Sequence, residues 1–254
     1  MNRKTVLITG AVRGIGRQTA ISMAQEGYDV LVNYHSSREE AQALCDLIMQ
    51  EHGGKAWPVY ADMGNVAEIR AMFEEIETLV PQLDVLVNNA GISSEVYFLD
   101  ATEADFDRMT AIDWKGVFFC SQLAAKSMIA KGVRGVIINV ASNQVEGCWP
   151  RATIYGPTKA AVAKFTRNAG MELCLHGVRM VAIAPGYTNV GWPEGDIRLE
   201  AAARLPLRRF ASTEEIAQGI IYLAGEKADY MVGSMLTIDG GATLPVVAAN
   251  DFVE

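Results

Sequence analysis

Tyr155 and Lys159, one helical turn apart, are the residues of this sequence best suited to moving a proton. Residues four positions apart share one helix face, so the phenol and the ammonium can point into the same cleft. A free tyrosine ionises near pH ~10 and is a poor base at neutral pH, but a neighbouring positive charge favours the phenolate. Ser142 could hold a substrate oxygen while Tyr155 gives or takes its proton. The three residues predict proton transfer at a carbonyl or alcohol oxygen, although such a pair is also common on ordinary amphipathic or exposed helices.

Short apolar segments alternate with helical stretches along the chain and must position these residues. We expect strands at residues 5–9, 29–34, 56–60, 84–88, 135–141, 178–184 and 235–238. Continuous apolar runs are typical of strands buried on both faces, and strand–helix alternation favours a parallel sheet between two helical layers. The pattern therefore predicts an α/β fold, a doubly wound Rossmann sheet of about seven strands with right-handed crossovers.

The first expected strand ends in a glycine-rich turn, Thr9-Gly10-Ala11-Val12-Arg13-Gly14-Ile15-Gly16, and a helix follows at once. Glycines at this point let the backbone approach a pyrophosphate, which the free N–H groups and positive dipole end of the helix attract. The spacing is G-x-x-x-G-x-G, and a glycine-rich turn alone is weak evidence because tight turns use glycine for several reasons. After the first strand of an alternating chain, it predicts a dinucleotide site.

Nothing resembling a linker interrupts the alternation, so we expect one dinucleotide-binding and catalytic domain over residues 1–254. The least regular stretch extends from residue 185 to residue 209 and is rich in glycine and proline. Because it breaks the periodicity directly after a strand, residues 186–209 are predicted to form a substrate lid.

Composition and charge argue against several classes of function. Half of the 254 residues are hydrophobic, but we find no apolar run of the ~18 residues that a membrane span needs, and the apolar segment near the start is too short for a signal peptide. The net charge of −8 and scattered basic residues argue against nucleic-acid binding. The four cysteines and three histidines lack metal-ligand spacing, so we expect no metal and reduced thiols in a cytoplasmic protein.

In this order along the chain, the motifs resemble those of the short-chain dehydrogenase/reductase family, in its compact single-domain branch, which includes 3-oxoacyl-[acyl-carrier-protein] reductases and glucose or polyol dehydrogenases. The resemblance covers nearly the whole chain. It is carried by the turn at residues 9–16, Asp62, Asn88-Asn89-Ala90-Gly91, Ser142, Tyr155 with Lys159, Pro185-Gly186 and Ile238-Asp239-Gly240-Gly241.

The resemblance implies an oxidoreductase that interconverts a secondary alcohol and a ketone by hydride transfer, with Tyr155 as general acid or base. It implies that Asp62 contacts the adenine, that Asn88 and its neighbours form the floor under the cofactor, and that Lys159 binds the nicotinamide ribose. It also implies a tetramer or dimer packed through the two long helices around Trp114 and Lys159. The residues expected to bind the cofactor are Gly10, Arg13, Gly14, Ile15, Gly16, Tyr34, His35, Ser36, Asp62, Met63, Asn89, Ala90, Gly91, Tyr155, Lys159, Pro185, Gly186 and Thr188.

The end of the second expected strand should select between the two nicotinamide dinucleotides. An acidic residue there would bind a free ribose 2′-hydroxyl and repel a 2′-phosphate. The segment after Val32 has no carboxylate before Glu39, whereas Arg13 can reach the same place and Ser36 can donate to a phosphate. We therefore expect NADP(H), with NAD(H) as the alternative if Arg13 and Arg38 are merely solvated surface charges.

Asp113 occupies a position where the family carries an asparagine that helps to hold a water leading from the lysine to solvent. A carboxylate can accept hydrogen bonds from such a water, but it cannot donate one when ionised, and a buried charge near Lys159 needs a partner. We include Asp113 with the catalytic residues Ser142, Tyr155 and Lys159, either paired with the lysine or protonated. A tolerated change in a supporting residue is the alternative.

The substrate pocket should lie between Ser142 and Tyr155 and after Gly186. Two tryptophans suggest an apolar wall, while Glu146 and Asn189 could bind hydroxyl groups of a sugar or polyol, although such residues often serve only local packing. We expect substrate contacts from Ser142, Gln144, Trp149, Tyr155, Tyr187 and Trp192.

The substrate classes that fit are a 3-oxoacyl thioester, a sugar or polyol, or a related carbonyl compound. The alternative function is a catalytically weak NADP(H)-binding protein that regulates a partner, with Asp113 as the sign of decay. The intact Ser142, Tyr155 and Lys159 argue against it. An epimerase or dehydratase is disfavoured by the length of the chain.

Overall fold

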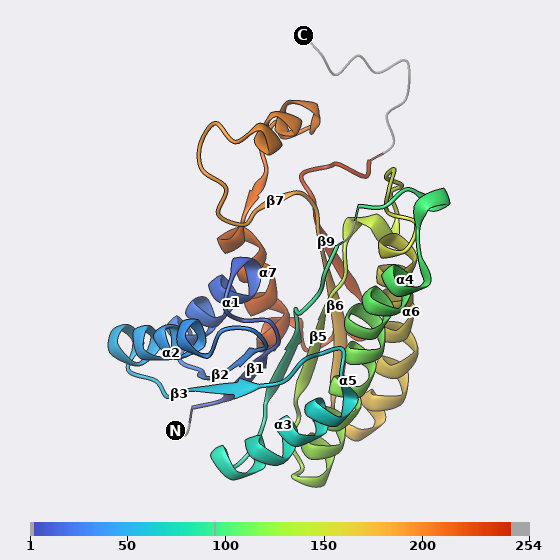
Figure 1. Cartoon of the computed structure of the whole chain (residues 1–254). Helices are drawn as coiled ribbons and strands as arrows, with labels where there is room; N and C mark the ends of the chain where they lie inside the picture. Colours follow the sequence, from blue (N-terminus) through green and yellow to red (C-terminus); the bar gives the residue numbers. More distant parts are fainter. Residues whose placement is uncertain (1–2, 94, 245–254) are drawn as a thin grey trace.

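The computed structural model describes residues 3–93 and 95–244 and confirms the expected α/β architecture; the outermost residues of the expected 1–254 domain lie outside this description. Seven parallel strands form one sheet in the order β3-β2-β1-β4-β5-β6-β9 (Figure 1). The strands are β1 (Thr5–Ile8), β2 (Asp29–Tyr34), β3 (Ala56–Tyr60), β4 (Val85–Asn88), β5 (Val136–Val140), β6 (Arg179–Pro185) and β9 (Met235–Ile238). The strand order reverses between β1 and β4, where open α/β sheets form ligand crevices beyond the carboxyl ends of their strands.

Strands β2, β3 and β9 have the expected bounds, and the others differ by a residue or so at their ends. Thr9, which we expected within the first strand, lies just outside it. Its hydroxyl accepts the N–H groups of Asn89 and Ala90 at 3.0 and 2.9 Å. At the other end of the sheet, the carboxylate of Asp84 accepts the N–H of Thr5 at 2.8 Å, and β4 begins one residue later than expected.

Helices cover both faces of the sheet. Figure 1 shows α1, α2 and α7 on one side and α3, α4, α5 and α6 on the other. Their bounds are α1 (Gly14–Gln25), α2 (Arg38–His52), α3 (Val66–Leu79), α4 (Glu103–Thr110), α5 (Val117–Ala130), α6 (Tyr155–Leu173) and α7 (Thr213–Ala224). A π-helical segment, η2 (Ala111–Gly116), joins α4 to α5. The short 3₁₀ segments are η1 (Phe98–Asp100), η3 (Asn143–Val145), η4 (Cys174–His176), η5 (Ile197–Arg204) and η6 (Glu226–Ala228).

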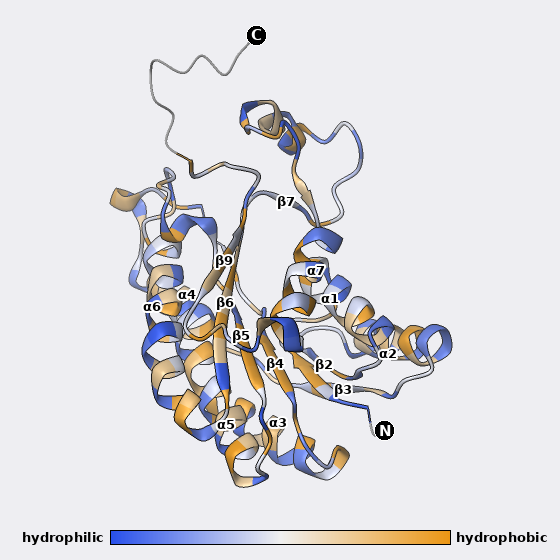
Figure 2. Ribbon diagram, turned by 180° about the vertical axis from the view of Figure 1, so that it is seen from behind, coloured by the Kyte–Doolittle hydropathy of each residue, from blue (hydrophilic) through white to orange (hydrophobic). Residues whose placement is uncertain are grey.

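Successive side chains along each strand pack alternately into two separate hydrophobic cores, one on each face of the sheet. In β1, Val6 and Ile8 point into the core shared with α1, α2 and α7, whereas Leu7 points into the core shared with α3 and α5. Alternation along a strand sends neighbours to opposite faces, so a sheet covered on both sides needs apolar residues at every position. Figure 2 shows the result as strands that are hydrophobic along most of their length, with hydrophilic residues on the outer helix surfaces.

The expected lid is more regular than its sequence suggested. After β6 the chain forms the two-residue strand β7 (Thr188–Asn189), continues through η5 and returns as β8 (Ala211–Ser212), which pairs with β7 in parallel. The segment between them stands above α1 and α7 in Figure 1. Its arginine- and alanine-rich 3₁₀ turns carry no periodicity strong enough to recognise in the sequence.

Candidate active site

Tyr155 and Lys159 open α6, and their side chains meet as the helical spacing predicted. The ammonium of Lys159 lies 5.6 Å from the centre of the Tyr155 ring and donates to the carbonyl of Val140 at 3.1 Å. Ser142 follows β5, and its buried hydroxyl accepts the N–H of Gln144 at 3.2 Å. All three line one cavity of about 380 Å³, so residues from β5 and α6 converge on the same space.

Lys159 is only 3 % exposed, which makes its charge sensitive to its partners. Burial lowers the pKa of the ammonium, but the negative charges that Tyr155 and Asp113 can carry raise it by more, so the net shift is upward. The direction of this shift favours the protonated amine.

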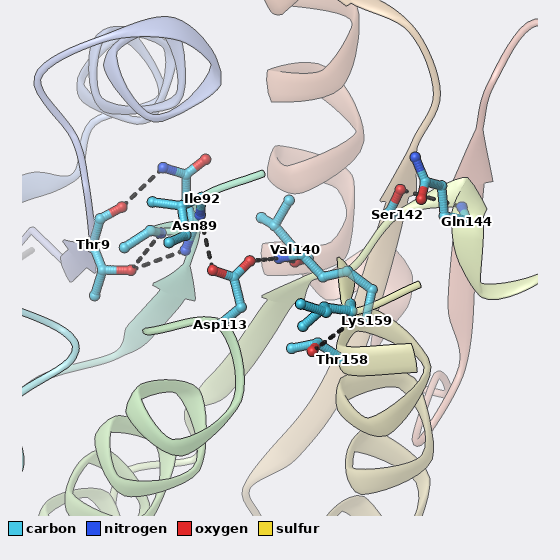
Figure 3. Close-up of polar contacts among 11 residues, drawn as sticks. Thr9, Asn89, Ile92, Asp113, Val140, Ser142, Gln144, Thr158 and Lys159 are labelled. Carbon is cyan, nitrogen blue, oxygen red and sulfur yellow. Dashed lines mark hydrogen bonds and ion pairs between the residues drawn. The ribbon is translucent and has the colours of Figure 1, made fainter. Parts of the chain in front are cut away.

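The second anionic partner is Asp113, which is fully buried in the π-helical segment. Its Oδ2 lies 3.1 Å from Nζ of Lys159, and its Oδ1 accepts the N–H of Ile92 at 2.8 Å (Figure 3). Burial raises the pKa of the Asp113 carboxyl by more than the Lys159 charge and the Ile92 N–H lower it, so the net shift is upward. Of the two expectations for Asp113, the contact found is the ion pair with the lysine.

Gly91 leaves the room that this pair needs. A Cβ at position 91 would lie 2.8 Å from Oδ2 of Asp113 and 3.3 Å from Nζ of Lys159. Both distances are shorter than a comfortable contact, so a side chain would push the two charged groups apart. The glycine of the Asn-Asn-Ala-Gly motif thus admits the ion pair as well as shaping the loop after β4.

The glycine-rich turn between β1 and α1 is built to hold an anion. Gly10 and Gly14 have φ of 60° and 55°, and a Cβ on Gly10 would lie 3.0 Å from Cα of Ala90. Arg13, which caps α1, supplies no side-chain acceptor to the first N–H groups of the helix. These donors remain free to bind a pyrophosphate, so the turn fits the dinucleotide that the motif implies. Ile15 and Gly16 lie in this first helical turn.

A polar framework that includes residues absent from the expected site supports the turn. The side chain of Asn33, buried in β2, accepts the N–H of Gly10 at 3.0 Å. Asn89 donates to the carbonyls of Thr9 and Gly10 at 2.9 and 3.1 Å, and Figure 3 shows it beside Thr9. The one sequence signal for Asn33 is a single polar residue at the end of an apolar strand, too common to identify a role.

A second buried chain of side chains ties the strands under the site to α6. Asn88 donates to Asn139 at 2.8 Å, and Asn139 donates to the hydroxyl of Thr166 at 2.9 Å. These bonds link β4, β5 and α6 at the level of the cavity floor. Asn139 and Thr166 were not identified from the sequence, because their partners are distant along the chain.

The residues expected near the adenine end gather at the carboxyl ends of β2 and β3. Tyr34 packs edge-on against Tyr60 with ring centres 5.6 Å apart, and His35 and Ser36 are exposed. The Nε2 atom of His35 lies 3.7 Å from Oδ2 of Asp62. A carboxylate therefore does lie beside the end of β2, a placement that the sequence reading did not anticipate because Asp62 follows a different strand. Met63, beside it, is buried.

Arg13, expected to reach toward this end of the site, is exposed. Across residues 3–93 and 95–244 its guanidinium forms no salt bridge.

The expected substrate residues form an aromatic wall at the mouth of the cavity. Trp149 donates its Nε1–H to the hydroxyl of Tyr187 at 2.7 Å, and the Tyr187 ring stacks on Phe210 with centres 5.2 Å apart. Trp192 packs edge-on against the same Phe210. Phe210 was not identified from the sequence; it follows the lid, and only folding brings it back to the residues after β6.

The remaining expected residues lie at the same edge of the sheet. Gln144 lines the cavity, and its Oε1 is buried without a hydrogen-bond partner within the described part of the chain. Gly186 donates its N–H to the carbonyl of Ile238 at 2.9 Å, and the hydroxyl of Thr188 donates to the carbonyl of Gly186 at 3.1 Å. Pro185 ends β6 and lines the cavity with Gly186 and Thr188. Thus every expected substrate residue borders this one space.

None of the helices within the described ranges combines the length and the hydropathy needed to cross a lipid bilayer. The same part of the chain holds no cluster of three or more histidine, cysteine, aspartate or glutamate side chains arranged to bind a metal ion.

Comparison with known proteins places these features in context. A family model described as Enoyl-(Acyl carrier protein) reductase matches residues 10–243. The chain is 34% identical over 244 residues to the uncharacterized oxidoreductase YohF of Escherichia coli, covering 95% of this chain and 96% of that protein. It is 35% identical over 241 residues to the 3-oxoacyl-[acyl-carrier-protein] reductase FabG of Staphylococcus aureus, covering 94% and 97%. The crystal structure of the acetoin dehydrogenase YohF from Salmonella typhimurium superposes with a TM-score of 0.90 at 31% identity, covering 98% and 99%.

Proposed function

This chain belongs to the short-chain dehydrogenase/reductase family of oxidoreductases, and we propose that it interconverts a secondary alcohol and a ketone with NADP(H) as its cofactor. The observation that carries the proposal is the meeting of Ser142, Tyr155 and Lys159 in one cavity beside the glycine-rich turn. A phenol with an ammonium 5.6 Å from its ring suits proton exchange with a substrate oxygen.

The chemistry divides between the cofactor and the side chains. When bound, the nicotinamide would supply or accept the hydride. Tyr155 gives its proton to the carbonyl oxygen in reduction and takes a proton from the alcohol in oxidation. The Ser142 hydroxyl donates a hydrogen bond to the same oxygen and stabilises the charge that develops there. Lys159, anchored on the Val140 carbonyl, holds its charge beside the phenol and binds the ribose of the cofactor.

The exposed polar groups near the carboxyl end of β2 support a preference for NADP(H). His35 and Ser36 are exposed there, and Arg13 is exposed in the turn that follows β1. These groups suit a 2′-phosphate. Asp62 lies close enough to His35 to oppose a phosphate, yet its other oxygen is already bound to the N–H of Gly64 at 2.7 Å. Comparing kcat/KM for NADPH and NADH tests the assignment, and a preference for NADH would refute it.

The cavity favours a small uncharged carbonyl compound. Its two ionised side chains, Asp113 and Lys159, offset each other, and Trp149, Tyr187 and Trp192 supply aromatic surface. A hydroxyketone or diketone, as the name of the Salmonella relative suggests, therefore ranks ahead of a 3-oxoacyl thioester or a sugar.

A substrate panel followed at the nicotinamide absorbance, in both directions, tests the function. Diacetyl, acetoin, acetoacetyl-coenzyme A and glucose represent the candidate classes. Turnover of at least one, abolished by Tyr155→Phe, is expected. Tight NADPH binding without turnover of any compound would favour the alternative, a cofactor-binding protein that regulates a partner.

Self-association through α5 and α6 is part of the proposal. Trp114, Phe118 and Phe165 pack edge to face and line an apolar groove between these helices. A homotetramer or dimer that packs the two helices against their copies would cover this surface, in keeping with the arrangement that the family resemblance implies. Light scattering coupled to size exclusion should give a multiple of 27.5 kDa, and a monomeric mass would contradict the proposal.

A further inference from the structure

The buried pair between Asp113 and Lys159 bears on the protonation of Tyr155. We propose that Asp113 is a positioning residue that opposes the charge of Lys159 and thereby favours the protonated form of Tyr155, the form that carbonyl reduction requires. The inference rests on the proposed function, in which Tyr155 exchanges a proton with the substrate oxygen.

The hydrogen bonds around Asp113 are those of a carboxylate. Oδ1 accepts the N–H of Ile92 at 2.8 Å, and Oδ2 faces the ammonium of Lys159 at 3.1 Å. A neutral carboxylic acid has to donate its own proton to an acceptor. Its partners within residues 3–93 and 95–244, the N–H of Ile92 and the ammonium of Lys159, are both donors, which favours the ionised form.

The fold has made space for two charges. Gly91 carries no side chain next to Oδ2 and Nζ. Figure 3 shows Asp113, from the π-helical segment, pointing toward Ile92 and Lys159. A buried ammonium or a buried carboxylate alone is costly, whereas the pair carries no net charge. π-Helical turns inside α-helices often mark functional positions.

The charge that reaches Tyr155 is therefore smaller than that of a lone lysine. An isolated ammonium 5.6 Å from the Tyr155 ring would stabilise the phenolate. The Asp113 carboxylate, 3.1 Å from that ammonium, opposes the effect. The protonated phenol is the form that reduction requires. With a reduced nicotinamide bound, which would supply the hydride to the carbonyl carbon, the Tyr155 phenol would give its proton to the carbonyl oxygen to form the alcohol O–H, and solvent would reprotonate the phenolate.

The titratable groups that act on this pair are few. Tyr155 and Lys159 come from α6 and Asp113 from the π-helical segment; Lys159 acts on Asp113, and Tyr155 and Asp113 act on Lys159. The loop after β4 contributes the backbone of Ile92, and β5 contributes the carbonyl of Val140. Lys115, next along the π-helical segment, is exposed.

The test measures the ionisation of Tyr155 directly, without substrate or cofactor. Tyrosinate absorbance is followed against pH in the wild type and in Asp113→Asn, each compared with the same protein carrying Tyr155→Phe. Asparagine can still accept the Ile92 N–H but leaves the ammonium unopposed, so the phenolate should appear at a pH about one unit lower. The control is Asp107→Asn, which removes an equal charge from an exposed position on α4 and should shift nothing.

An unchanged or higher midpoint in Asp113→Asn overturns the proposal. If that variant does not fold, the wild type decides: a Tyr155 midpoint well below the ~10 of a free tyrosine would overturn the proposal, and a midpoint at or above that value supports it. Failure of the proposed function looks different, because it would appear as a lack of turnover whatever the titration shows.

Discussion

Asp113 and Lys159 form a salt bridge of 3.1 Å at the base of the cavity, with the aspartate fully buried and the lysine 3 % exposed. The pair joins the π-helical segment to α6 and lies directly beneath Gly91 of the loop after β4. Three elements that are distant in the sequence thus depend on one electrostatic contact. Because the ammonium of this pair also lies 5.6 Å from the Tyr155 ring, we propose that the contact bears on the reaction as well as on the packing.

Replacing Tyr155 with phenylalanine should remove the proton donor and leave the cofactor site intact. We expect kcat to fall by roughly 10²–10⁴-fold, the usual contribution of a general acid or base, while NADPH affinity by fluorescence titration changes little. Tyr222→Phe, at an exposed position on α7, is the matched control and should behave as wild type. Near-normal turnover in Tyr155→Phe would exclude the phenol as the acid.

Gly91→Ala should disrupt the ion pair without altering any charge. The added Cβ would lie 2.8 Å from Oδ2 of Asp113, so the carboxylate must move from Lys159 or from the Ile92 N–H. We expect at least about 1–3 kcal/mol loss in the free energy of unfolding, measured by chemical denaturation, together with reduced activity. Gly225→Ala, where the new Cβ would make only ordinary contacts, should have a smaller effect. Equal stability losses in both variants would contradict the steric argument.

Arg13→Ala should weaken binding of NADPH more than binding of NADH. A charge-assisted hydrogen bond to a phosphate contributes about 1.5–3 kcal/mol, so the dissociation constant for NADPH should rise by roughly 10–100-fold. Arg17→Ala removes the same charge from an exposed position further along α1 and serves as the control. Isothermal titration with both cofactors gives the ratio, and an equal loss for NADH and NADPH would show that Arg13 does not read the 2′-phosphate.

The Arg209–Glu215 pair at the end of the lid should stabilise the protein in a pH-dependent way. Hydrogen bonds from Arg209 and from the backbone N–H of Ser212 lower the pKa of Glu215 from 4.5 to about 2. A carboxyl with a lowered pKa contributes stability above its ordinary pKa and loses it as the pH falls through the folded value. Glu215→Gln should therefore cost less than about 1 kcal/mol at neutral pH, because the pair is largely exposed.

Denaturation curves collected while the pH falls from about 4.5 to about 2 should show the difference between Glu215→Gln and wild type shrinking. Glu226→Gln, just beyond the C-terminal end of α7, provides a control outside the capping box. A difference that stays constant over this range would show that the ion pair is not its source.

Much of the fold could be predicted from the sequence because its determinants are local and periodic. The apolar runs located all seven strands of the main sheet, since a strand covered on both faces needs an apolar residue at each position. The i, i+4 spacing placed Tyr155 and Lys159 on one helical face, and the three glycines identified the turn before α1. Each inference used neighbours within a few residues.

Only the tertiary structure decided the partners of charged and polar groups that lie far apart in the sequence. It placed Asp113 against Lys159, brought Asp62 beside His35, and placed Phe210 between Tyr187 and Trp192. These contacts depend on how crossover helices and loops pack at the carboxyl edge of the sheet, and the energy of a charge depends on that burial and on its neighbours. Residue type and sequence spacing show which charged and polar groups the chain carries. The distances between those groups are set only when the chain folds.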